Sequence, residues 1–377
     1  MPVPLPERGK ARTDVPDAEE VRLLSRGTIT ATAPAGGLTA TQRVLIEAIP
    51  PAMTGRPAVF DAPAVTPAEF AQGLAARDET FRARIVQVMV LTALVLRPIP
   101  EDVARRVAEF AAELCIDDGM LEVAQRFADG SLGLAAIDFE RNGYTAAWHP
   151  EDAAALHTSD ELVDAWEEVT HDPPLAARWE QLEDLPPGAL GRRVTEFYRA
   201  RGFAYPGRPG SAPPLLAQHD WVHVLADYGT TVEPELEVFA LIARANDDLR
   251  AFSLLAMVVS LFETGYLRRG AGLFESSAGH LSEAGMATRL ADAMRRGALC
   301  PGSIDFLRTD WFELAPLGVE EVRRHFGMVP KSPQALAAGS VGPWEPGGIS
   351  EFQSRAGREQ AERAGIPYDA FGARSRV

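Results

Sequence analysis

Two histidines, His219 and His223, lie four residues apart in the segment QHDWVHVLADYGTTVEPELEVF, which covers residues 218–239. On an α-helix this spacing puts both imidazole rings on one face. Paired imidazoles on a helix can bind one metal cation, and Asp220 offers a carboxylate beside them. The spacing therefore predicts a helical metal site, although a single histidine is more often an ordinary surface or core residue.

Glu235 completes this site only if the helix that carries the histidines ends before it. It lies twelve residues after His223, and on an uninterrupted helix that separation turns it about 120° away from the histidine face. The sequence GTT at residues 229–231 breaks the helix and favours a second one that begins near Glu233 and folds back. The pattern predicts a metal site between two helices, and a helix cap is the alternative reading of these acidic residues.

The whole pattern, HDxxH followed by eleven residues and a glutamate, resembles the signature of the fourth coenzyme Q (ubiquinone) biosynthesis protein family. The flanking segments LPPGALGRRVTEFYRARGF, RRGALCPGSIDFLRTDW and VEEVRRHFGM are similar to that family as well. The resemblance covers residues from about 180 to about 330. The chain differs in the segment AYPGRPGSAPP before His219, which is shorter than the one family members usually carry.

The resemblance implies that His219, Asp220, His223 and Glu235 coordinate a divalent metal, and zinc is the metal linked to the family. Because the set lacks a thiolate, Fe, Mn or Co would also suit it. The resemblance further implies a protein of ubiquinone or other quinone biosynthesis that removes the carboxyl group of a prenylated hydroxybenzoate and installs oxygen at that carbon. Zinc has no redox chemistry, so either another metal acts or zinc only polarises the substrate. The resemblance thus implies a metal-dependent oxidative decarboxylase and leaves its catalytic residues unassigned.

Apolar segments with helical character follow the motif at residues 236–245 and 251–267. They predict a groove for a prenyl chain or another lipid. The residues expected to line the groove are Phe239, Leu241, Leu254, Leu255 and Val258. Ordinary core packing is the alternative reading of the same segments.

Two other functions fit parts of the sequence. In the first, the protein is a non-catalytic lipid-binding scaffold with a structural metal, which presents a prenylated intermediate to partner biosynthetic enzymes. In the second, it is an HD-type metal phosphohydrolase, because His171 and Asp172 repeat the adjacent histidine and aspartate of His219 and Asp220. That class also needs a further histidine and a later aspartate at the same metal.

The composition excludes several classes of partner and site. A net charge of −16 and a pI near 5.0, without any run of Lys and Arg, repel nucleic acid. Cys115 and Cys300 lie far apart, which excludes a disulfide framework and a cysteine zinc site. The N-terminal sequence lacks the apolar core of a secretory signal, and the longest apolar run, residues 251–262, is shorter than the roughly 20 residues of a membrane-spanning helix. We expect a cytoplasmic protein, with peripheral membrane contact and homo-oligomerisation left open.

Apolar residues recur at helical spacing along most of the chain, and alternating runs of β-branched residues are scarce. We therefore expect an all-α fold, a helical bundle with the metal site between two helices and a smaller helical domain before it. The expected parts are a flexible segment at 1–40, a helical domain at 41–149, the coenzyme Q biosynthesis-type metal-binding domain at 150–330, and a loose tail at 331–377.

The helical domain at 41–149 resembles the tellurite-resistance TerB-like domains in its short helices and Asp-Gly turns. Thr66 and Glu69 form a capping-box pattern, with Pro67 at the first helical position. The helices predicted in this domain cover residues 66–76, 80–96, 100–114 and 120–128.

Overall fold

In the computed structural model, the residues described are 15–96, 99–116, 172–209, 211, 214–245, 255, 259, 279–302 and 304–369. These residues form helices, turns and one isolated bridge between Ala189 and Gly318, and no β-strand occurs among them. The predicted all-α fold is confirmed.

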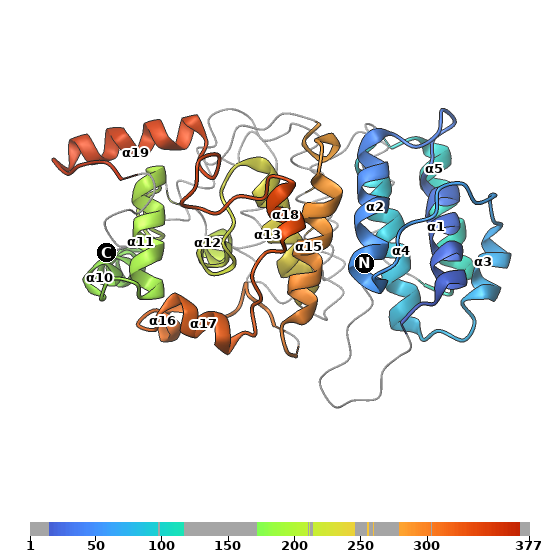
Figure 1. The fold of residues 1–377 in the computed structure, drawn as a ribbon, viewed down its shortest axis with the longest axis horizontal. Helices are drawn as coiled ribbons and strands as arrows, with labels where there is room; N and C mark the ends of the chain where they lie inside the picture. The colour runs from blue at the N-terminus through green and yellow to red at the C-terminus, as the bar shows by residue number, and fades with distance from the viewer. Residues whose placement is uncertain are drawn as a thin grey trace.

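Among the described residues, five helices form the N-terminal unit, which occupies one end of the molecule (Figure 1). They are α1 (Ala18–Thr32), α2 (Ala40–Thr54), α3 (Pro67–Gly73), α4 (Glu79–Leu94) and α5 (Glu101–Glu113). The last three match the predicted helices to within a few residues, while the helix predicted at 120–128 lies outside the described residues. The capping box is confirmed, because Thr66 and Glu69 each accept a hydrogen bond from the other's backbone N–H.

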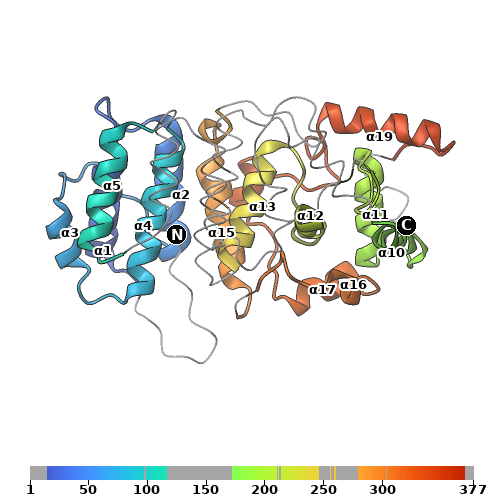
Figure 2. The same ribbon diagram turned by 180° about the vertical axis from the view of Figure 1, so that it is seen from behind.

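The second unit carries the HDxxH motif. Its central helices are α12 (Pro214–Ala226) and α13 (Val232–Ala245), and α13 lies between α12 and α15 (Met286–Leu299), as both views of the ribbon show (Figures 1 and 2). At the far end, α11 (Leu190–Arg201) packs against α19 (Glu351–Arg363). The remaining elements are α10 (Pro173–Gln181), η1 (Leu182–Asp184), η2 (His280–Ser282), α16 (Trp311–Leu314), α17 (Val319–His325) and α18 (Pro333–Ala337).

The two units meet through helices α2 and α15, which lie side by side (Figures 1 and 2). Buried apolar residues of both units belong to one continuous hydrophobic core. The predicted division near residue 150 falls outside the described residues and stays a prediction.

The structure differs from the expectation at both ends of the chain. Helix α1 lies in the segment expected to be flexible, where Asp17 forms a capping box with Glu20 and the helix buries Val21 and Leu24. Helices α18 and α19 lie in the expected loose tail. A capping box between Ser350 and Gln353 starts α19. These three helices form because local caps and buried side chains outweigh the surrounding Pro- and Gly-rich composition.

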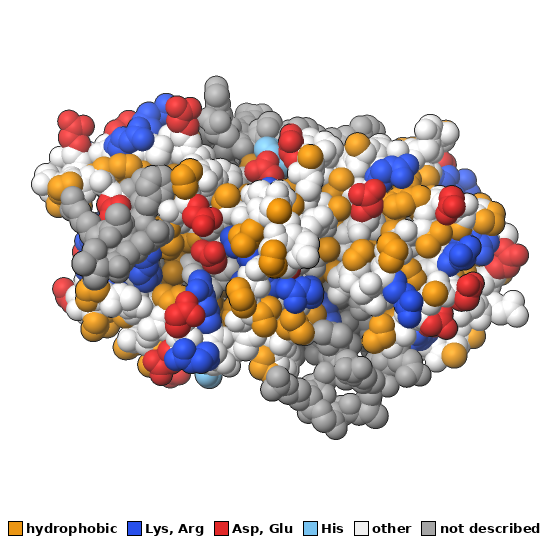
Figure 3. Space-filling view, in the orientation of Figure 1, with side chains coloured by type: hydrophobic (Ala, Val, Ile, Leu, Met, Phe, Trp, Pro, Cys, Tyr) orange, Lys and Arg blue, Asp and Glu red, His pale blue; other side chains and the backbone are white. Residues whose placement is uncertain are grey.

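Within the described ranges, no helix combines the length and apolar character needed to cross a membrane. On the face drawn in Figure 3, basic and acidic side chains are interspersed with apolar ones rather than gathered by sign. The long apolar run at 251–262 lies outside the described residues, apart from Leu255 and Val259, which are both buried.

Candidate metal centre

The predicted break between the two motif helices is confirmed. Helix α12 ends at Ala226 and α13 begins at Val232. The carbonyls at the end of α12 that lack a helical partner are bound by arginines from other helices: Arg296 Nη2 donates to the Ala226 carbonyl (2.8 Å) and Arg323 Nε to the Leu225 carbonyl (2.7 Å). Cations at this position satisfy unpaired carbonyls and complement the helix dipole, so they fix the end of the helix that carries the histidines.

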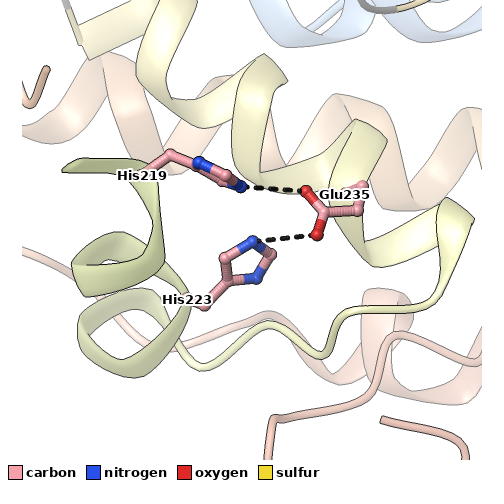
Figure 4. Close-up of side chains that lie close together, drawn as sticks. All are labelled: His219, His223 and Glu235. Atoms are coloured by element: carbon pink, nitrogen blue, oxygen red, sulfur yellow. Dashed lines mark ion pairs between the residues drawn. The ribbon is translucent and has the colours of Figure 1, made fainter. Parts of the chain in front are cut away.

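Three of the four predicted ligands converge in the protein interior (Figure 4). His219 Nε2 lies 3.4 Å from Glu235 Oε2, and His223 Nε2 lies 3.2 Å from Glu235 Oε1. The exposed fractions of the three residues are 5%, 0% and 1% for His219, His223 and Glu235. One donor atom from each lies within 4.8 Å of the others. Folding α13 back beside α12 therefore closes the site as the spacing predicts.

This donor set fits a divalent metal. Two ligand atoms at roughly 2.1 Å from a tetrahedral ion lie about 3.4 Å apart, close to the two nitrogen–oxygen distances observed. His223 Nδ1 lies 3.2 Å from the carbonyl oxygen of Tyr228, which can only accept a hydrogen bond. The proton of the neutral ring is therefore on Nδ1, and the lone pair of Nε2 faces the carboxylate, as in metal-binding histidines.

Asp220, the fourth predicted ligand, borders the convergent set but does not belong to the tight group of three. Its Oδ1 lies 3.8 Å from His219 Nε2, and its Oδ2 accepts a hydrogen bond from the Tyr198 hydroxyl at 2.5 Å. Burial raises the pKa of Asp220, and the neighbouring histidines and Tyr198 partly offset that rise. Its role as a ligand stays a prediction.

The electrostatics of the site favour an ionised Glu235. Burial alone would raise the pKa of this carboxyl, but the positive charge of His223 and the hydrogen bonds that both histidines donate when they are protonated lower it to about 2. A buried cation, Arg201, lies near the same site: burial lowers its pKa to about 9, opposed by the charges of Asp220 and Glu235 among others. Glu235 is thus an anion at neutral pH.

Aromatic rings line the site. The ring of Phe239 stacks on His219 with centroids 4.9 Å apart, and the ring of Phe197 stacks on His223 at 5.7 Å. These rings limit the orientations of both imidazoles and exclude water from them.

The structure separates the residues predicted to line a lipid groove. Phe239 forms a wall of the metal site, whereas Leu241 and Leu255 are buried in the hydrophobic core. Leu254 and Val258 lie outside the described residues. The groove stays a prediction.

For the phosphohydrolase alternative, Asp172 is the N-cap of α10, where its side chain accepts a hydrogen bond from the Leu175 N–H at 3.0 Å. The adjacent His171 lies outside the described residues.

Sequence reasoning missed the contribution of α11, whose residues Phe197, Tyr198 and Arg201 all reach the metal site or its loop. The segment EFYRAR does carry a signal, because two aromatics and an arginine at helical spacing are typical of a buried helix face. The partners of these side chains lie 22 or more residues away along the chain, so local spacing alone does not reveal them.

Comparisons with known proteins found one structural likeness. No family model and no curated protein matches the chain. A solved structure from Nostoc punctiforme, named "Putative ubiquinone biosynthesis protein", aligns with 66% of this chain and 98% of its own, at 18% identity and a TM-score of 0.29. Overlap at this level does not transfer a function to this chain.

Proposed function

We propose that this chain is a metal-dependent protein of ubiquinone-type biosynthesis that acts on a prenylated aromatic acid. The observation that carries the proposal is the buried convergence of His219, His223 and Glu235 within an HDxxH-x11-E pattern. The proposed reaction replaces the ring carboxyl by a hydroxyl and releases CO2. This is a two-electron oxidation of the ring carbon, so it requires an external oxidant such as dioxygen.

His219, His223 and Glu235 would hold the divalent metal, with Asp220 beside them. When bound, the metal supplies Lewis-acid polarisation of the substrate carboxylate, and Fe, Mn or Co would add redox chemistry that zinc lacks. Tyr198 holds Asp220 in place by its hydroxyl. Phe239 and Phe197 keep water away from the imidazoles, and the proposed lipid groove would extend from Phe239 toward Leu255 for the prenyl chain.

Metal content and product formation test this function. The purified chain should contain one divalent metal ion. The variant His223→Ala should lose this ion, because only one of the two histidine ligands on the helix face would remain. The matched control is His325→Ala, since His325 is exposed on α17 and lies outside the group of three. Elemental analysis measures the metal, and release of CO2 from a prenylated hydroxybenzoate measures the reaction with zinc, iron, manganese or cobalt. A folded His223→Ala protein with the metal content of the parent would show that the site is wrongly assigned.

A lipid-binding scaffold is the second candidate. It is favoured by the near-complete burial of His223 and Glu235, because a buried site limits the access of solvent and substrate to the metal. A metal-loaded chain that binds the prenylated acid, yet releases no CO2 with any of the four metals and dioxygen, would support the scaffold over the enzyme.

A further inference from the structure

The loop between the two motif helices is bound by a segment far along the chain. Residues 227–231 join α12 to α13 and so set the distance between the histidines and Glu235. Within that loop, the Gly229 N–H donates to the Val341 carbonyl at 3.0 Å, and the Thr230 N–H donates to the Gly348 carbonyl at 2.8 Å. The backbone of the loop is therefore paired with residues of the segment 341–353, called here the C-terminal segment.

Thr230 is bound on both its side chain and its backbone. Its Oγ1 donates to Gln353 Oε1 at 2.7 Å, while Gln353 Nε2 donates to the Thr230 carbonyl at 3.2 Å. Arg201 Nε donates to the same hydroxyl at 2.7 Å. Gln353 is fully buried, so these hydrogen bonds form where water cannot replace them and are costly to lose.

Arg201 connects the C-terminal segment to a metal ligand. Its Nη2 donates to the carbonyls of Pro343 and Gly348, each at 3.0 Å. Its guanidinium lies over the ring of Phe197, 3.9 Å from the centroid, and Phe197 stacks on His223. Contacts between buried groups therefore connect the C-terminal segment to His223.

The loop and the C-terminal segment also approach too closely for side chains. A Cβ on Gly229 of the loop would lie 2.5 Å from the Cα of Gly348 and 2.8 Å from its carbonyl oxygen. Contacts to backbone atoms cannot be relieved by a rotamer change. The two segments therefore have one close-packed arrangement.

From these contacts we infer that the C-terminal segment is a working part of the metal centre, with Arg201, Thr230 and Gln353 as positioning residues for the ligands. The segment lies beyond the stretch of about 180–330 that resembles the quinone family. The inference rests on the proposed function only in that the site holds a metal. Ligand geometry must be held to within about 0.5 Å for tight binding, and outer partners of a site commonly change metal affinity 10–100-fold.

The test uses the full chain loaded with Co2+, which reports ligand geometry through its visible absorption. Thr230→Val removes the hydroxyl bound by Arg201 and Gln353, and Gln353→Ala removes the partner from α19. Both variants should release Co2+ to a chelator about 10–100-fold faster than the parent and shift its absorption bands. The matched control is Tyr368→Phe, which loses a 2.9 Å hydrogen bond to the Ala200 carbonyl of α11 and none to the loop. It should release Co2+ at the parent rate.

The Co2+ experiment distinguishes failure of this inference from failure of the proposed function. If the parent binds Co2+ and both folded variants keep its spectrum and release rate, the inference is overturned while the proposed function stands. If the parent binds no Co2+, the proposed function falls, and the inference with it.

Hydrogen exchange of the unmodified chain gives a measurement that does not depend on a variant folding. Because linkage is reciprocal, a metal that needs the ordered loop must also stabilise it. Co2+ should slow amide exchange in residues 341–353 as well as in residues 227–231, and should leave α1 (Ala18–Thr32) unchanged. Protection at the loop alone, with none at 341–353, would overturn the inference.

Discussion

His223 is fixed at both nitrogens of its ring. The Tyr228 carbonyl accepts the proton of Nδ1, and Glu235 faces Nε2 at 3.2 Å. The backbone N–H of Tyr228 in turn donates to the His223 carbonyl at 3.0 Å. One tautomer and one ring orientation are therefore set before any metal arrives, which lowers the entropic cost of binding.

Tyr198 fixes the orientation of Asp220 by the hydrogen bond from its hydroxyl. The substitution Tyr198→Phe removes this hydroxyl alone and so tests its contribution. Phenylalanine keeps the ring that packs on Trp179 at 4.9 Å but leaves the buried Asp220 carboxyl without that donor. We expect a loss of about 1–3 kcal/mol in the free energy of unfolding, and metal binding about 10–100-fold weaker if Asp220 is the fourth ligand. Urea unfolding and metal titration are the measurements.

The control for this prediction is Tyr205→Phe. Its hydroxyl donates to Glu183 Oε1 at 2.6 Å, away from the ligands, so metal affinity should match that of the parent. Unchanged affinity in Tyr198→Phe, alongside reduced stability, would remove Asp220 from the ligand set.

At the scale of elements, helices α13 and α15 pack closely against each other. A Cβ on Gly297 of α15 would lie 2.3 Å from the Leu241 carbonyl oxygen of α13. The buried ion pair of Glu237 with Arg289 also crosses this interface, at 2.7 Å. Since α13 carries Glu235 on its other side, the packing on α15 helps to determine where that carboxylate lies.

Gly297→Ala tests this packing. On an exposed helix the change would stabilise the protein by about 1 kcal/mol, but here the added methyl meets the backbone of α13 and must push the helices apart. We expect a net loss of about 1–3 kcal/mol in urea unfolding. Gly36→Ala is the control, because a Cβ there meets nothing within 4 Å. Stability of Gly297→Ala at or above that of the parent would contradict the close packing.

The helices and the loops between them also show which structural features could be predicted from the sequence. The break at residues 229–231 and the convergence of Glu235 on the histidines follow from local spacing, so the sequence was sufficient to predict them. The binding of Thr230 by Gln353 joins residues separated by 123 positions, and nothing in the spacing indicates it. Helix α1 was missed although Asp17 and Glu20 form a capping-box pattern, because nearby Pro and Gly residues suggested a flexible segment.

At the scale of the whole molecule, three separate stretches of chain surround the candidate metal site. The motif helices carry the candidate ligands, the C-terminal segment binds the loop between them, and α2 of the N-terminal unit packs on α15. Because α15 supports α13, a chain of packed helices connects the N-terminal unit to Glu235. The buried residues at this interface are apolar and belong to the same core as those of the second unit. Separation of the two units would therefore expose apolar surface.

Expression of fragments tests this dependence. The fragment 150–330, expected from the sequence to be an independent domain, lacks the partner of Thr230 and the helix that covers α15. We expect it to be helical by circular dichroism but to bind metal at least about tenfold more weakly than the full chain and to unfold with less cooperativity. Extending this fragment to residue 369 restores the C-terminal segment and should restore metal affinity. Adding the N-terminal unit instead should mainly raise the melting temperature toward that of the full chain. If the fragment 150–330 matched the full chain in metal affinity and thermal unfolding, the site would be complete within the motif domain and neither flanking stretch would contribute to it.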